Sequence, residues 1–226
     1  MIAIIRAPRF ISRRMDWQAL LASQPVLASI PPELRGLAEQ RKIEAGKTLF
    51  RLGDRPRGVF CVVAGEVRLV RRARNGAEII LQRSRGGFFA EASLYGERYH
   101  CDAVSTQPGT LLYFPAQAFR AALSKDAAFR EAWMTHLASE LRTLRAQCER
   151  LSLKSAEARI VHYIDTEGTG GVVTLTESRK AWASQLGLTH EVLYRTLRRL
   201  QSSGMLRINA NRIILLARTK DRRGTR

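Results

Sequence analysis

The pattern of the chain changes once, near Ala116, and this change constrains the fold more than any other feature. Before it, from Ile43 to Pro115, short apolar runs typical of β-strands alternate with turn signals. After it, residues 126–153 contain neither proline nor glycine and repeat apolar residues at spacings of three and four. Many short strands predict a β-roll or jelly-roll. The second pattern predicts one long helix.

The β-type region divides into short runs separated by turn signals. Asn75-Gly76 is a strong hairpin signal, because both residues tolerate the positive φ angles of a type I′ turn. The other turn signals are Gly53-Asp54, Ala64-Gly65 and Gly86-Gly87. The predicted strands are Gly46–Phe50, Val59–Val63, Glu66–Val70, Ile79–Leu81 and Leu111–Phe114.

The long helical region predicts a contact between two copies of the chain. Its apolar residues form a narrow stripe with charged flanks, which is typical of a coiled coil. The alternative is a helix packed on its own domain, but so narrow a stripe more often faces a partner helix. Cys148 is interpreted as a small hydrophobe on this stripe, with a redox role as the alternative. The stripe, which we call the seam, consists of Met134, Leu137, Leu141, Leu144, Cys148 and Leu151.

The C-terminal region contains two helix signals separated by a short turn. Ser178 is a favourable N-cap for a helix that ends before Gly187, and Thr189 is a favourable N-cap for a second helix. Two helices joined by a four-residue turn containing glycine form a helix-turn-helix. The following runs, Met205–Ile208 and Arg212–Leu216, predict a β wing. The region therefore predicts a winged helix-turn-helix.

The second of these helices carries a candidate pair for reading DNA bases. In such a module its first turns enter the major groove, and Glu191 and Arg195 project from one side of it. Arginine donates two hydrogen bonds to guanine, and glutamate accepts one from cytosine. The alternative is an ordinary salt bridge between the two side chains. Candidates for phosphate contacts are Arg179, Lys180, Thr189, His190, Arg198 and Arg199.

The composition agrees with a nucleic-acid partner. The 226 residues include 38 Lys and Arg against 20 Asp and Glu, a formal net charge of +18. This excess of positive charge favours a polyanionic partner such as nucleic acid, with acidic membrane surfaces as the alternative partner.

Cysteine content and hydropathy indicate the location of the protein. Three scattered cysteines and no apolar run of roughly 20 residues indicate a cytoplasmic protein outside the membrane. The sequence shows no phosphate loop, nucleophile elbow or metal-ligand spacing, so we expect neither an enzyme nor a metal site.

These patterns divide an α+β chain into four segments. Residues 1–16 are expected to form a flexible basic arm, and Met15 is an alternative start of translation. Residues 17–125 are expected to form a β-roll domain, which opens with two short helices. Residues 126–154 are the expected dimerisation helix. Residues 155–226 are the expected winged helix-turn-helix with a basic tail.

Four groups of residues match one family in order and spacing: Leu49–Asp54, Val63–Val67, Gly87–Glu91, and Glu191 with Arg195. The chain resembles the CRP/FNR superfamily of bacterial transcription regulators over roughly residues 17–217. The resemblance implies a homodimer on a two-fold symmetric operator, with double-stranded DNA as a partner. It also implies RNA polymerase as a partner if the protein activates transcription. The alternative is an architectural DNA-binding protein without sequence preference, which the net charge would also suit.

The resemblance also implies that residues 17–125 form a sensor domain similar to cyclic-nucleotide-binding domains, and it suggests where an effector would bind. In members that bind cyclic AMP, a Gly-Glu pair begins the phosphate cassette and an Arg-Ser pair ends it. Here Glu91 matches the ribose-binding carboxylate, but Cys101 and Asp102 stand in place of the Arg-Ser pair. A cyclic phosphate would lack its bidentate arginine contact, so cyclic nucleotide is not expected, and Arg98 is the candidate to replace the missing charge. The pocket candidates are Glu91, Ala92, Ser93, Arg98, His100, Cys101 and Asp102.

The long helix also departs from the members that bind cyclic nucleotides. Aligned by spacing, Glu140, Leu144 and Arg145 stand where nucleotide-contacting members carry Arg, Thr and Ser. These three polar contacts are therefore altered as well.

Other effectors of the family are not expected either. The N-terminal cysteine cluster of iron–sulfur members is absent from the sequence, so no such cluster is expected. Tyr99-His100-Cys101 offers haem ligands in principle, but a loop with a satisfied histidine and a buried thiol is the simpler interpretation. Effector, operator sequence, target genes and sign of regulation stay open.

Overall fold

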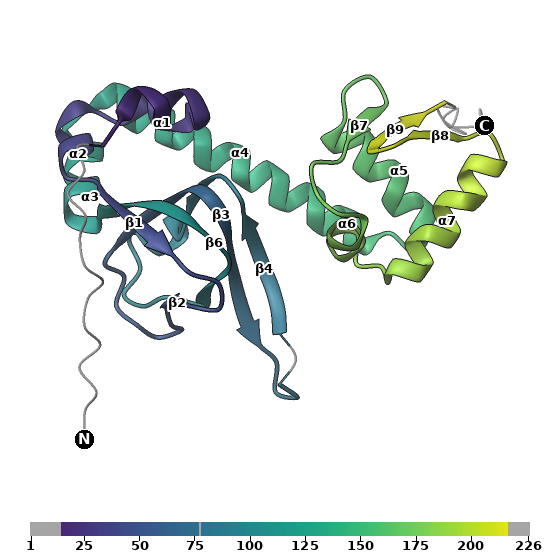
Figure 1. Cartoon of the computed structure of the whole chain (residues 1–226), viewed down its shortest axis with the longest axis horizontal. Coiled ribbons are helices and arrows are strands. Elements are labelled where there is room, and N and C mark those ends of the chain that lie inside the picture. The colour runs from purple at the N-terminus through teal and green to yellow at the C-terminus, as the bar shows by residue number, and fades with distance from the viewer. Residues whose placement is uncertain (1–14, 77, 217–226) are drawn as a thin grey trace, which may run out of the picture. The chain divides into compact units, whose positions relative to one another are not determined.

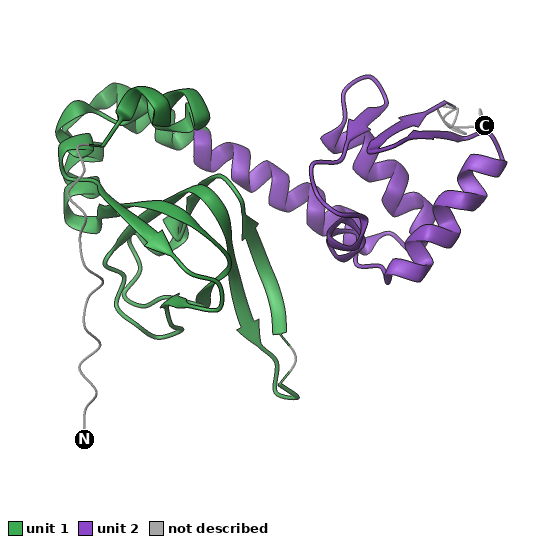
Figure 2. Ribbon diagram, in the orientation of Figure 1, with its two compact units in different colours: residues 1–135 green, residues 136–226 purple. Residues whose placement is uncertain are grey.

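The structure is a computed structural model that describes residues 15–76 and 78–216 (Figure 1). The predicted basic arm, except for its last two residues, and the basic tail from residue 217 lie outside the described residues. The chain divides into two compact units, residues 1–135 and 136–226 (Figure 2). In the described ranges no helix has the length and apolar character that a membrane span needs.

The first unit is built on an antiparallel sheet whose described part has six strands. Its two long strands, β3 and β6, pair with each other over most of their length (Figure 1). The short strands β1 and β2 pair with β6, whereas β4 and β5 pair with β3. The strands are β1 (Glu39–Ile43), β2 (Thr48–Phe50), β3 (Gly58–Arg72), β4 (Glu78–Ser84), β5 (Gly87–Phe89) and β6 (Asp102–Pro115).

Aromatic side chains fill the core of this sheet. Phe50 stacks on Tyr99 with ring centroids 3.6 Å apart, and Phe60 stacks on Phe89 at 5.1 Å. The ring of Tyr113 lies 5.3 Å from that of Phe60. Buried aromatic rings remove large apolar areas from water, so this cluster stabilises the β-roll and occupies its interior.

Short helices precede the sheet and two helices follow it. Asp16 caps the first helix, because its Oδ1 accepts a hydrogen bond from the backbone N–H of Ala19 at 3.1 Å. Two short helices were predicted here, but the described chain has three short helical elements, since Pro25 begins a separate 3₁₀ helix. The elements are α1 (Trp17–Ser23), η1 (Pro25–Ser29), α2 (Pro32–Gly36), η2 (Glu91–Ser93), α3 (Ala116–Lys125) and α4 (Ala127–Ser152).

The helices after the sheet pack through a second aromatic cluster. Phe119 of α3 lies 4.7 Å from Trp133 and 5.3 Å from Phe129, both in the first turns of α4. Trp133 also meets Phe88 of β5 edge to face at 5.0 Å. The start of α4 is therefore packed on its own unit, and the predicted long helix is confirmed between Ala127 and Ser152.

The strand predictions are wrong in several places, since β5 and the part of β6 before Leu111 were missed as well as β1. β1 was missed because Glu39-Gln-Arg-Lys is polar, yet it pairs with β6 in register from Glu39 with Tyr113 to Ile43 with Gly109. Ala64-Gly65 is a bulge inside β3 rather than a turn, since the register with β6 shifts around it and Gly65 has a φ of 90°. A Cβ at Gly65 would lie 2.7 Å from the carbonyl oxygen of Pro108, so glycine is required there.

The predicted hairpin at Asn75-Gly76 is confirmed, but its turn type is wrong. β3 and β4 pair from Val67 with Ser84 to Arg72 with Glu78. Gly76 has a φ of 80°, whereas the described non-glycine residues with positive φ do not include Asn75. The loop is built on a hydrogen bond from the N–H of Gly76 to the carbonyl of Ala73 at 2.9 Å, as is common in longer hairpin loops.

The second unit combines three helices with a small sheet after the end of α4. Strands pair antiparallel in the order β7-β9-β8, so the predicted wing is confirmed and gains a third strand. Its core is apolar, with Ile160, Trp182, Leu193 and Ile213 fully buried. The elements are α5 (Ala156–Glu167), β7 (Val172–Thr174), α6 (Arg179–Gln185), α7 (His190–Ser202), β8 (Leu206–Asn209) and β9 (Arg212–Leu215).

Candidate DNA interface and sensor pocket

The helix-turn-helix begins each of its helices with the predicted cap. Ser178 Oγ accepts a hydrogen bond from the N–H of Ala181 at 3.2 Å, and Thr189 Oγ1 accepts one from Val192 at 3.2 Å. These hydroxyls satisfy backbone donors that a helix leaves free at its start. Gly187 has a φ of 62° in the turn between α6 and α7, which is the left-handed conformation expected there.

The buried face of α7 determines which of its side chains face solvent. Leu193, Leu197 and Leu200 are at most 2% exposed and anchor α7 in the core of the unit. Because the helix repeats every 3.6 residues, Glu191 and Arg195 fall outside this face, and both are exposed. The structure therefore holds the two predicted base-reading residues on the solvent side of α7.

Glu191 and Arg195 are not paired with each other. No ion pair within 4.0 Å joins them in the part of the chain that the structure describes. The alternative interpretation, a salt bridge along the helix, is therefore not realised in this structure. Both side chains keep their hydrogen-bonding groups available for a ligand.

The candidates for phosphate contacts fall into two groups. Lys180, His190 and Arg198 are exposed. The other three already have partners: Thr189 is the cap of α7, Arg199 donates to Glu157 Oε2 at 2.7 Å, and Arg179 donates to the carbonyl of Ala210 at 3.0 Å. The exposed ion pair of Arg199 is worth little, so a phosphate can compete for this side chain.

Tyr194 is a surface residue of α7 that the sequence reasoning missed. It is 43% exposed. Its ring lies 4.4 Å from that of His190, and the guanidinium of Arg179 lies 5.5 Å from its centroid. Tyr194 thus orients two of the phosphate candidates. Its position next to Arg195 on the outer face of the predicted helix was the available signal.

In the first unit, the end of the predicted cassette is bound to a neighbouring loop. Asp102 Oδ1 accepts a hydrogen bond from the N–H of Leu52 at 2.7 Å, and Arg98 Nη1 donates to the carbonyl of Gly53 at 3.0 Å. The N–H of Gly53 donates to the carbonyl of Tyr99 at 2.9 Å. Arg98 and Asp102 therefore connect the end of the cassette to the loop that contains Leu52 and Gly53.

The remaining pocket candidates differ in exposure. Ala92 and His100 are exposed, Glu91 is half-buried, and Ser93 is buried with its Oγ 3.4 Å from His100 Nδ1. Cys101 is only 2% exposed and belongs to the aromatic core. Burial raises the pKa of the Cys101 thiol, and the charge of Asp102 raises it further. A thiolate is thereby disfavoured, which argues against Cys101 as a metal or haem ligand.

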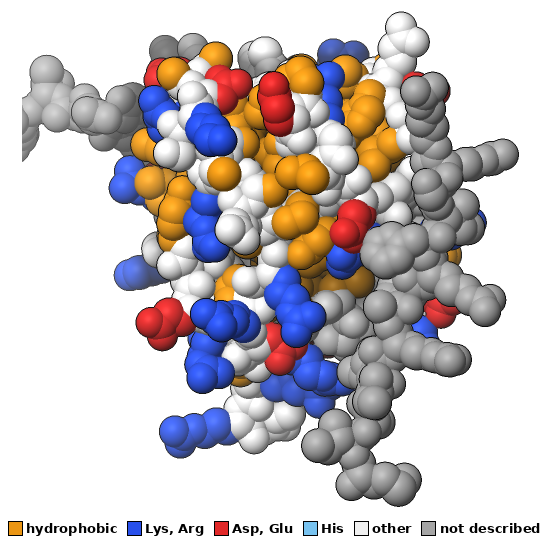
Figure 3. Space-filling model, turned by 90° about the vertical axis from the view of Figure 1, so that its left-hand side faces the viewer, with side chains coloured by type: hydrophobic (Ala, Val, Ile, Leu, Met, Phe, Trp, Pro, Cys, Tyr) orange, Lys and Arg blue, Asp and Glu red, His pale blue; other side chains and the backbone are white. Residues whose placement is uncertain are grey.

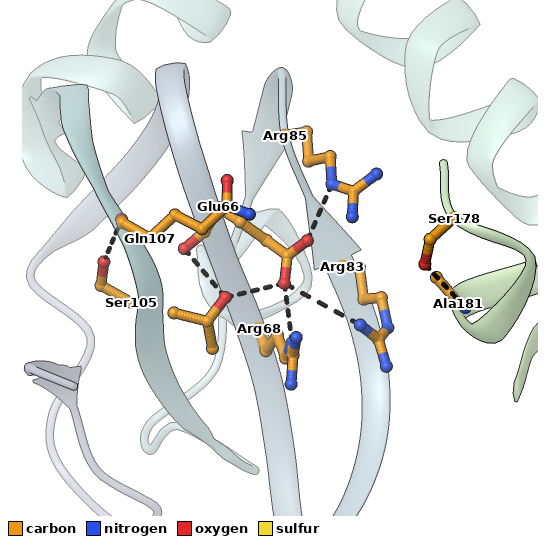
Figure 4. A network of polar contacts seen from close by, with 9 residues as sticks. Glu66, Arg68, Arg83, Arg85, Ser105, Gln107, Ser178 and Ala181 are labelled. Atoms are coloured by element: carbon orange, nitrogen blue, oxygen red, sulfur yellow. Dashed lines mark hydrogen bonds and ion pairs between the residues drawn. The ribbon is translucent and has the colours of Figure 1, made fainter. Parts of the chain in front are cut away.

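A buried carboxylate organises a cluster of arginines on β3, on β4 and in the bend directly after β4 (Figure 4). Glu66 is 1% exposed. Its carboxylate accepts hydrogen bonds from Arg68 Nε at 2.8 Å, Arg85 Nε at 2.7 Å and Thr106 Oγ1 at 2.7 Å. Burial raises the pKa of Glu66, but the hydrogen bonds from Thr106, Arg85 and Arg68 outweigh it and lower the pKa to about 2. The sequence reasoning did not find this cluster, because its members come from β3, from β6 and from the bend after β4.

The excess of positive charge does not by itself mark the DNA interface. On the face shown in Figure 3, Lys and Arg gather in the lower part, and hydrophobic side chains lie at the surface above them. The candidate DNA interface is therefore taken from the exposed side of α7 rather than from net charge.

Fold and site together define a DNA-binding protein in which a β-roll precedes a winged helix-turn-helix. Residues 40–126 match the cyclic nucleotide-binding domain family, and residues 137–220 match the Crp-like helix-turn-helix domain family. The chain belongs to the CRP/FNR superfamily and is a transcription regulator with a helix-turn-helix DNA-binding domain.

Individual relatives agree with this assignment. The chain is 27% identical to the global nitrogen regulator of Synechococcus elongatus over 186 residues, 76% of this chain and 83% of that protein. It is 24% identical to the fumarate and nitrate reduction regulatory protein of Escherichia coli over 193 residues, 81% and 77% of the two chains. The structure of FixK2 from Bradyrhizobium japonicum shares the fold, with a TM-score of 0.59 and 24% sequence identity. The match covers 80% of this chain and 93% of that chain. The architectural alternative is not favoured.

Proposed function

We propose that the protein is a homodimeric, sequence-specific regulator that binds a two-fold symmetric operator. In this proposal Glu191 and Arg195 of α7 read bases in the major groove, and Lys180, His190, Arg198 and Arg199 contact phosphates. The observation that carries the proposal is the exposed, unpaired position of Glu191 and Arg195 on the side of α7 opposite its buried leucines. Such side chains at the start of the second helix are the ones that reach base edges.

The surface of α4 supports dimerisation through the seam. Met134 is 62% exposed, Leu141 48%, Leu144 51% and Leu151 43%. Large apolar side chains that follow one line on a helix are typical of a contact with a second helix. A two-fold dimer would present two copies of α7 to two half-sites about one helical turn apart, roughly 10 bp.

The first unit, which contains the expected sensor domain, supports an effector other than cyclic AMP. The charged groups at the cassette end, Arg98 and Asp102, already hydrogen-bond to the loop at Leu52 and Gly53. An anionic phosphate beside Asp102 would be repelled by the carboxylate. We further propose that the protein works in the cytoplasm by binding rather than by catalysis, with RNA polymerase as its partner where it activates transcription.

Selection of binding sites from random duplexes tests the proposal. We expect a two-fold symmetric consensus. Arg195→Ala should then relax the preference at one base pair per half-site by about 1–3 kcal/mol. Arg198→Ala, the matched arginine on the same helix, should weaken all sequences about equally. A selection that returned asymmetric DNA or no consensus would overturn the proposal.

A further inference from the structure

Arg159 at the start of α5 joins two parts of the second unit that are distant in sequence. Its Nε donates to the carbonyl of Leu153 at 2.9 Å and its Nη2 to that of Leu151 at 3.2 Å, at the end of α4. Its Nη1 donates to the carbonyls of Leu186 and Gly187, at 3.2 and 3.1 Å, in the turn before α7. One guanidinium thus satisfies carbonyls that a helix end and a turn leave without donors.

The same two segments also touch directly. A Cβ at Gly187 would lie 2.7 Å from Leu151 Cδ2 and 3.1 Å from Arg159 Nη1. Gly187 also has a φ of 62°, which disfavours any other residue. The backbone of the turn therefore lies against Leu151, which is the last residue of the proposed seam.

A second arginine holds the end of α4 to the far end of α5. Arg150 is 3% exposed. Its Nη2 donates to Glu167 Oε1 at 2.7 Å and to Thr166 Oγ1 at 3.1 Å. Its guanidinium lies 4.6 Å from the ring centroid of Tyr163. The last turn of α4 is thus attached along α5, and this leaves the connection between the two helices little freedom to bend.

We infer that Arg159 is a positioning residue that sets the spacing between the half-sites which the dimer accepts. The inference rests on the proposed two-fold dimer. A shift of one base pair moves a half-site by about 3.4 Å along the DNA and rotates it by about 35°. If the turn before α7 is fixed to the end of the dimerisation helix, the dimer cannot follow such a shift without breaking the contacts of Arg159. If the turn is released, each α7 can adjust independently.

The test compares DNA affinity across operators whose half-sites are moved apart or together by one and two base pairs. A duplex with a single half-site is included, and fluorescence anisotropy is measured at one salt concentration. For the unsubstituted protein we expect at least about a tenfold loss of affinity per base pair of change, equivalent to about 1.4 kcal/mol. Arg159→Ala should reduce this ratio to about two- to threefold and leave binding to the single half-site within about twofold, a difference under about 0.5 kcal/mol.

Two further variants keep the test decisive. Lys154→Ala removes one positive charge from the same connection, where Lys154 is exposed, and should keep the sharp spacing preference. Arg159→Lys keeps the charge but cannot reach all the carbonyls with one ammonium, so it should flatten the preference even if Arg159→Ala fails to fold. A folded, dimeric Arg159→Lys that kept the unsubstituted ratio would overturn the inference. If the unsubstituted protein ignored spacing, the inference alone would be overturned. If it failed to dimerise, the proposed function would fall as well.

Discussion

The seam on α4 gives the sharpest quantitative prediction. Leu141 and Leu144 are 48% and 51% exposed in the single chain. Full burial of a leucine is worth about 2 kcal/mol, so covering the exposed half contributes about 1 kcal/mol per side chain. The double variant Leu141→Asp/Leu144→Asp alters two such side chains on each of two subunits and removes about 4 kcal/mol. The dimer dissociation constant should therefore rise about 1,000-fold. It should rise still more because the introduced carboxylates would be buried in the contact.

Sedimentation velocity over a series of micromolar concentrations should show a monomer for this variant and a dimer for the unsubstituted protein. Thiol labelling provides a second measurement. Cys148 lies on the seam and is exposed in the single chain, whereas Cys61 and Cys101 are buried. Cys148 should therefore react faster with an alkylating reagent in the double variant than in the dimer.

The matched control is Leu37→Asp/Leu52→Asp. These leucines are 56% and 55% exposed and lie outside α4, so this variant should remain dimeric. The reasoning is refuted if Leu141→Asp/Leu144→Asp stays dimeric while Cys148 reacts as slowly as in the unsubstituted protein.

Three other changes have expected outcomes that chemical denaturation can measure. Thr189→Ala removes the cap of α7 and should lower the free energy of unfolding by about 1 kcal/mol. Ala210→Gly should raise it by about 0.5–1 kcal/mol, because Ala210 has a φ of 52° at a turn position that favours glycine. The pKa of Glu66 is lowered from 4.5 to about 2, so the stability that its charge provides is present above pH 4.5 and lost as pH falls toward 2. Glu66→Gln should remove that part of the acid dependence; an unchanged profile would contradict the role of Glu66.

The helix-turn-helix was predictable because its signals are local. A cap such as Thr189 acts on a backbone N–H three residues away, and the buried face of α7 follows directly from helical spacing. β1 was not predictable in the same way. Its polar residues become a strand only by pairing with β6, where Glu39 faces Tyr113, and no local pattern encodes that distant partner.

The same distinction applies to the site. Glu191 and Arg195 were identified because a helix places residues four apart on one side. The pairing of Arg199 with Glu157 joins residues 42 positions apart. Arg159 reaches carbonyls in two other segments, and a carbonyl group carries no residue-type signal. Sequence therefore predicted which side chains of α7 face solvent but not which residues hold the helix in place.

The structure of the second unit limits how a signal can reach the DNA. Bending between α4 and α5 would break the hydrogen bonds of Arg159 to Leu151 and Leu153 and the ion pair of Arg150 with Glu167. At about 0.5–1.5 kcal/mol for each hydrogen bond, such bending costs several kcal/mol. A change in how two copies of α4 pair along the seam leaves all these contacts intact. Because Leu151 belongs to the seam and also touches the turn at Gly187, a shift in that pairing would move α7 directly. If the protein dimerises through the seam as proposed, an effector bound in the first unit would regulate DNA binding most economically by altering the seam.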